Sequence, residues 1–73
     1  MDVREIRDMT DEEIIDEIED MKEAEYKLRL QAASGQLEDL TVLKRTRRDI
    51  ARLKTVQRER ELAAQVASEE SNG

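Results

Sequence analysis

Apolar residues recur at intervals of three and four along the first half of the chain, which is the spacing of one face of a helix. Thr10 precedes this stripe and is followed three residues later by Glu13, so the two have the spacing of an N-terminal capping box. Ser34 and Gly35 give the next stop signal, because glycine is favoured just beyond the end of a helix. The pattern therefore predicts a helix over residues 11–33. Its apolar face comprises Ile14, Ile18, Met21, Leu28 and Ala32.

A second helix is predicted after Asp39, whose side chain can cap the free amides of the next turn. No proline or glycine interrupts the segment that follows until the run SEESNG. We therefore expect a helix over residues 40–65 and a flexible acidic tail over residues 67–73. The positions that share one face of the second helix are Leu43, Thr46, Ile50, Leu53 and Gln57.

These elements predict an all-α fold, a two-helix antiparallel hairpin with long, coiled-coil-like arms. The connection between the two predicted helices is short, as in helical hairpins. Val3, Ile6 and Met9 lie three residues apart and could form one further helical turn that covers the open end of the hairpin. We expect a single domain over residues 1–66.

Composition limits what such a domain can do. With 73 residues, the chain can bury only about 60% of its unfolded surface. It is 44% charged and its one aromatic residue is Tyr26, which places the chain close to the boundary with disordered sequences. We therefore expect either a chain that needs a partner to hold its fold or a weakly stable hairpin that folds alone.

Several classes of function are excluded by the residue types. The chain has no cysteine and no histidine, which excludes disulfides, thiol or imidazole catalysis and most transition-metal sites. The many carboxylates are predicted on a helix, where they form neither a calcium loop nor a catalytic pocket. We expect no enzyme activity, no cofactor and no metal. No apolar run approaches the ~18 residues of a membrane span, and the first residues do not resemble a signal peptide. We expect a soluble, cytoplasmic protein.

Charge is segregated along the chain, although the formal net charge is -6. Residues 1–25 carry twelve acids and three bases, whereas residues 26–60 carry ten bases and four acids. Residues 61–73 add three further acids. Six of the 13 bases lie within residues 44–54, so the predicted second helix is strongly basic within an acidic protein.

The basic cluster favours contact with RNA. On a helix with about 100° per residue, four cations point away from the apolar stripe and two lie on its flank. These are Lys44, Arg45, Arg48 and Arg52, with Arg47 and Lys54 on the flank. The cluster could be a solvated face, or it could neutralise the acidic helix, but a face of nearly one sign and rich in arginine suits phosphate better. Nothing in the chain supplies an element for the DNA major groove or an aromatic platform for single strands, so structured RNA is the best candidate.

A second apolar strip lies beside the main stripe of the first helix and comprises Ile15, Tyr26, Leu30 and Ala33. These side chains could cover the N-terminal turn, or they could form a docking surface for a neighbouring protein or RNA. The excess of apolar width over a simple two-helix seam favours docking slightly. Glu25 interrupts the main stripe at a position where an apolar residue would be expected.

The stretch YKLRLQAASGQLEDLTVLKRTRRDIARLKTV, residues 26–56, resembles the family of bacterial large-subunit ribosomal protein twenty-nine. The family pattern has an aromatic residue, then NLR, then QA(S/T)GQL and, after a short interval, VRRDIARIKT. The matching segments here are Tyr26, Leu28-Arg29, Gln31, Ala33 to Leu37, Arg47 to Arg52 and Lys54-Thr55. The resemblance extends from about Ile6 to Arg60, and the two motifs stand at the correct mutual spacing.

This resemblance implies a structural, non-catalytic component that binds 23S-type large-subunit rRNA at the rim of the polypeptide exit tunnel. It also implies a neighbour, ribosomal protein twenty-three. By position, the implied RNA contacts are Arg29, Gln31, Ser34, Gly35, Gln36, Lys44, Arg47, Arg48, Arg52 and Lys54, to which the helix projection adds Arg45. The acidic first helix is unusual for a ribosomal protein, and we expect its acidic face to point away from RNA. The alternative is a non-ribosomal, charge-zoned hairpin that acts as a protein–protein interaction module.

Overall fold

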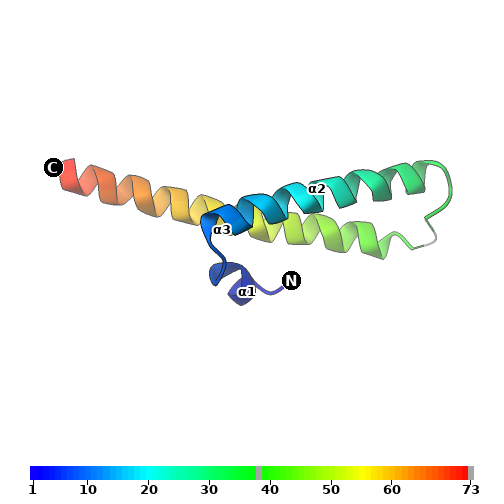
Figure 1. Ribbon diagram of the computed structural model, residues 1–73, viewed down its shortest axis with the longest axis horizontal. Helices are drawn as coiled ribbons and strands as arrows, with labels where there is room; N and C mark the ends of the chain where they lie inside the picture. The colour runs from blue at the N-terminus through cyan, green and yellow to red at the C-terminus, as the bar shows by residue number, and fades with distance from the viewer. Residues whose placement is uncertain (38, 73) are drawn as a thin grey trace.

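The computed structural model describes residues 1–37 and 39–72, with side chains as far as Glu69, and its elements are three α-helices (Figure 1). They are α1 (Val3–Arg7), α2 (Asp11–Ala33) and α3 (Thr41–Asn72). The helices α2 and α3 lie side by side and run in opposite directions, and α1 packs against α3 where α2 begins. The predicted all-α hairpin with a short N-terminal helical turn is therefore confirmed.

The ends of α2 are fixed by local hydrogen bonds. The Thr10 hydroxyl oxygen accepts a hydrogen bond from the backbone N–H of Glu13 at 3.1 Å, as an N-cap does. At the other end, Gly35 has a φ of +77°, in the left-handed region that glycine adopts without strain. The N–H of Gln36 then donates to the carbonyl of Gln31 at 2.8 Å, which satisfies a terminal carbonyl and turns the chain back.

The helix α3 begins close to the predicted position but extends further. A side-chain oxygen of Asp39 accepts a hydrogen bond from the backbone N–H of Thr41 at 2.9 Å, and the helix begins there. In place of the flexible tail expected over residues 67–73, the helix continues to Asn72, and Gly73 lies outside the described residues. No glycine or proline precedes Gly73 in this segment, and its alanine and glutamate residues favour a helix. As Figure 1 shows, this end of α3 projects beyond the start of α2.

The core lies where all three helices meet. Its buried members are Ile6, Ile14, Ile18, Leu53 and Val56. Ile6 of α1 and Leu53 of α3 are both fully buried. Burying each such side chain contributes about 1.5–3 kcal/mol, so this small cluster supplies a large part of the stabilisation available to a short chain. The predicted stripe of α3 omitted Val56, which lies on the side of that helix that packs against the cluster.

Arg60 of α3 ties down the junction between α1 and α2. Its guanidinium donates to a carboxylate oxygen of Asp11 at 2.7 Å and to the backbone carbonyl of Arg7 at 3.1 Å. Asp11 lies in the first turn of α2 and Arg7 in the last turn of α1. The Arg60 side chain therefore joins the end of α1 and the start of α2 to α3.

The second apolar strip does not cover the N-terminal turn. Ile15, Tyr26 and Leu30 are 46%, 61% and 52% exposed, and Ala33 is exposed as well. The turn packs instead against α3, because Ile6 joins the cluster that contains Leu53. The first of the two interpretations of this strip is therefore wrong.

Truncation of the central core residue should unfold the hairpin. Replacing Leu53 by Ala removes a fully buried side chain and should cost about 2–5 kcal/mol, which is comparable to the total stability of a small domain. Leu62→Ala in the same helix is the matched control, because Leu62 is 48% exposed and its loss should stay within about 0.5 kcal/mol. Urea unfolding followed by circular dichroism measures both, and equal losses in the two variants would contradict the assigned core.

Replacing Gly35 should destabilise the protein through backbone strain and not through a steric clash. A Cβ atom at this position would meet nothing within 4 Å, so Gly35→Ala should cost only the left-handed backbone strain, about 1–2 kcal/mol. Gly35→Asn should cost less, because asparagine tolerates this region better. Thermal unfolding of the three proteins tests the difference. The same loss for Ala and Asn would show that strain is not the cause.

Candidate nucleic-acid interface

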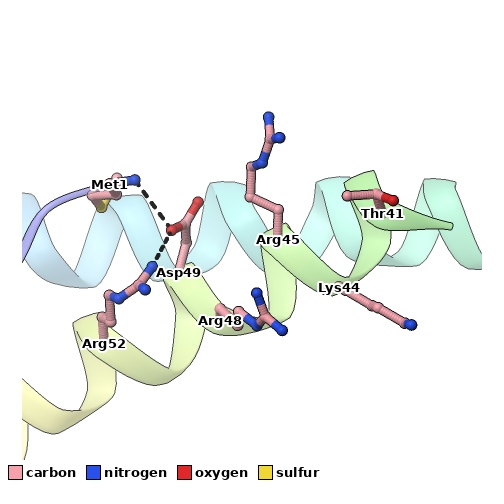
Figure 2. Close-up of a pocket in the computed structure, with 7 residues that line it drawn as sticks. All are labelled: Met1, Thr41, Lys44, Arg45, Arg48, Asp49 and Arg52. Atoms are coloured by element: carbon pink, nitrogen blue, oxygen red, sulfur yellow. Dashed lines mark hydrogen bonds and ion pairs between the residues drawn. The ribbon is translucent and has the colours of Figure 1, made fainter. Parts of the chain in front are cut away.

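Four of the predicted RNA-binding cations line one groove on α3. The groove has a volume of about 370 Å³ and is lined by Met1, Thr41, Lys44, Arg45, Arg48, Asp49 and Arg52 (Figure 2). In this view Lys44 extends away from the ribbon of α2, Arg48 lies over the ribbon of α3, and Arg45 extends upward across the ribbon of α2. The seam residues of α3 determine this arrangement, since Leu43, Ile50 and Leu53 face inward and are buried. The cations are thereby directed outward.

Asp49 is a buried carboxylate within this cationic groove. It is 7% exposed, and one of its oxygens accepts a hydrogen bond from the Arg52 guanidinium at 3.2 Å. The same oxygen lies 3.3 Å from the α-amino group of Met1. Figure 2 shows both groups converging on it. A buried carboxylate with two cationic partners is satisfied, and it holds the Arg52 side chain in one orientation at the edge of the groove.

The remaining cations of the basic cluster are free to bind an anion. Within residues 1–37 and 39–69, Lys44, Arg45, Arg48 and Lys54 form no ion pair and no side-chain hydrogen bond, and all four are exposed. A phosphate that approaches them therefore displaces water and counterions and breaks no internal contact.

Arg47 and Arg29 are engaged differently, through Glu25. This carboxylate lies 3.6 Å from Arg47 across the hairpin and 3.8 Å from Arg29 one turn along α2. Glu25 thus occupies the seam as an ion-pair partner, which explains why an acid stands within the apolar stripe. Both arginine side chains remain more than half exposed, so these pairs are weak and do not prevent a second contact.

The residues at the turn lie apart from the groove. Gln31, Ser34, Gly35 and Gln36 are all exposed at the end of the hairpin where α2 meets the connection to α3. The Ser34 hydroxyl donates to the carbonyl of Gln31 at 3.1 Å, so this side chain already helps to close the helix. The predicted site residues therefore form an arc from the turn along α3, and the groove itself brings together Lys44, Arg45, Arg48 and Arg52.

Asp39 adds a fixed negative charge near the start of α3. Hydrogen bonding from the Thr41 side chain and backbone N–H lowers the pKa of its carboxyl, and the positive charge of Arg45 acts in the same direction. The carboxylate therefore stays ionised at neutral pH and complements the positive end of the helix dipole. It marks the end of the cationic surface nearest the turn.

Sequence reasoning missed one component of the groove, the α-amino group of Met1. It reaches Asp49 over a separation of 48 residues because α1 folds back onto α3. Helical periodicity carries no signal for such a contact. The pairing of Asp49 with Arg52, in contrast, follows from their spacing of three residues along a helix.

The described part of the chain contains no cluster of three or more acidic residues that could hold a metal ion. Among the described helices, none is both long and apolar enough to cross a membrane.

Comparison with known proteins identifies the family. A model of the family described as ribosomal L29 protein matches residues 4–60. The large ribosomal subunit protein uL29 of Geobacillus stearothermophilus is 50% identical over 64 residues, which cover 88% of this chain and 97% of the relative. The protein of the same name from Desulforamulus reducens is 48% identical over 62 residues, or 85% and 95% of the two chains. The Staphylococcus aureus protein (strain JH9) is 46% identical over 69 residues, or 94% and 100%. The chain therefore belongs to the ribosomal L29 protein family, and it is a structural constituent of the large subunit of the cytoplasmic ribosome and not an enzyme.

Proposed function

We propose that this protein binds large-subunit rRNA through the outward face of α3, near the polypeptide exit tunnel and beside ribosomal protein twenty-three. The observation that carries the proposal is the groove with Lys44, Arg45, Arg48 and Arg52 on its walls. Three of these four cations have no internal ion pair in the described chain. Because the chain is a ribosomal protein, the alternative of a non-ribosomal interaction module has no further support.

Binding of this kind is electrostatic. RNA carries condensed counterions along its phosphates, and cations of the protein that replace them release these ions into solution. Arginine adds geometric preference, since its planar guanidinium can bind two phosphate oxygens at once. Arg48 and Arg52 lie one helical turn apart, so they can contact successive positions along one strand.

The distribution of acids supports the choice of α3 over α2 as the RNA-facing helix. Asp16, Glu19 and Asp20 of α2 are exposed. Phosphates would be repelled by this surface, so α2 is left to face solvent or the neighbouring ribosomal protein. The exposed strip formed by Ile15, Tyr26 and Leu30 lies on the same helix and suits a protein contact there.

Reversing two free cations should prevent incorporation into the large subunit. Lys44→Glu with Arg48→Glu places two carboxylates in the groove without breaking any internal ion pair of the described chain, so helicity should be unchanged. The double variant should no longer co-sediment with large subunits through a sucrose gradient. Lys22→Glu with Lys27→Glu makes the same change in charge on α2, removes only the exposed Lys27–Glu23 ion pair, and should co-sediment normally. Normal incorporation of the Lys44/Arg48 variant would overturn the proposal, as would persistence of the wild-type protein on particles whose rRNA has been digested.

Affinity for protein-free large-subunit rRNA should fall steeply with salt. With about four phosphate contacts, the slope of log K against log salt should be about -3. Arg48→Gln removes one contact and should reduce the slope by about one. Filter binding of wild type and variant from low to moderate salt measures both slopes. A slope near zero for the wild type would contradict an electrostatic mechanism.

A further inference from the structure

A second groove lies next to the cationic one, between α1 and α3. It has a volume of about 260 Å³ and is lined by Val3, Arg7, Ala51, Arg52, Thr55, Val56 and Glu59. Arg52 lines both grooves, so the two adjoin each other on α3. One groove is cationic and polar, and the other has an apolar floor.

The floor and the rim of this second groove differ in chemistry. Val3, Ala51 and Val56 supply apolar surface, while Arg7, Arg52 and Glu59 supply charge around it. Arg7 and Glu59 lie 4.0 Å apart and are 62% and 54% exposed, so their ion pair is weak and can open. The hydroxyl of Thr55 donates to the carbonyl of Ala51 at 2.8 Å, which leaves its oxygen free to accept. The groove therefore offers an apolar surface with a hydrogen-bond donor and acceptors at its edge.

These features fit a nucleobase. A base is a flat group with apolar faces and a polar edge, and an arginine guanidinium can stack on it. The carboxylate of Glu59 can accept from an exocyclic amino group, as acids do from cytosine. The volume is below the range of about 300–1,000 Å³ that is typical of sites for drug-sized ligands, so it suits one ring system rather than a larger molecule.

We propose that this groove receives a single unpaired nucleobase of the same rRNA whose phosphates lie on Lys44, Arg48 and Arg52. This inference rests on the proposed function. It adds that an unpaired base of the RNA is recognised in addition to the phosphates. The position of Arg52 between the two grooves favours RNA over a protein side chain as the occupant, because a phosphate on that arginine would bring its nucleotide next to the second groove. Phosphate contacts alone do not distinguish one duplex from another. Recognition of a splayed-out base would restrict binding to positions where the folded RNA leaves a base unpaired.

The test uses large subunits that lack this protein and are rebuilt with wild type, Ala51→Leu or Ala24→Leu. Ala51 is exposed and lines the groove, and a leucine there adds bulk at the site without changing charge. Ala24 is exposed on α2 and receives the same substitution as a control. Hydroxyl radicals report protection of the RNA backbone. Dimethyl sulfate and a carbodiimide report the accessibility of the Watson–Crick edges of bases.

With wild type and with Ala24→Leu, we expect a protected backbone segment that includes one unpaired base protected from chemical modification. With Ala51→Leu, that base should become as reactive as in particles without the protein, while backbone protection persists. If no base responds to Ala51→Leu although the backbone is protected, the base site is overturned and the proposed function stands. Loss of both protections in Ala51→Leu would show that Ala51 belongs to the backbone contact and would also overturn a separate base site. If the wild type protects no backbone, the proposed function fails and this inference with it.

Discussion

The contact of Ile6 with the cluster around Leu53 is the packing on which the rest of the structure depends. The chain is short and has few large apolar residues, so it buries one tight group where three helices meet. That group orients α3, because a helix whose Leu53 and Val56 face the core must turn its opposite side outward. The cations lie on that side. Packing at the open end of the hairpin therefore decides where positive charge is exposed.

Ion pairs refine this arrangement rather than create it. Glu25 and Arg47 meet across the seam, and Arg60 joins the ends of α1 and α2, but these side chains are partly exposed and such pairs contribute little each. Asp49 is different, because it is buried and removal of its partners would leave a buried charge. It links α1, through the amino group of Met1, to the arginine that lines both grooves. The fold of the N-terminus and the geometry of the groove are thereby coupled.

Much of the fold could be read from the sequence, since its signals are local. Thr10 and Gly35 mark the ends of α2, and the spacing of Leu43, Ile50 and Leu53 gives the inward face of α3. What could not be read depends on tertiary contacts. The position of the Met1 amino group and the formation of a groove between α1 and α3 follow from how α1 docks. The end of the second helix was expected before the run SEESNG, but the only glycine of that run is Gly73, and α3 continues to Asn72.

An acidic protein can lie on RNA if its unpaired negative charges are kept at a distance from the phosphates. The molecule measures 57 × 20 × 16 Å, and nine of its 19 acids lie on α2, whereas the exposed cations of the groove lie on α3. At physiological ionic strength exposed charges are screened beyond about 8 Å, which is less than the width of the hairpin. The phosphates would then respond to Lys44, Arg45 and Arg48 and hardly at all to the acids on the far helix. Because charge is segregated between two helices, the net charge of the chain is a poor guide to its partner. The sign of the charge on the outward face of α3 is a better guide.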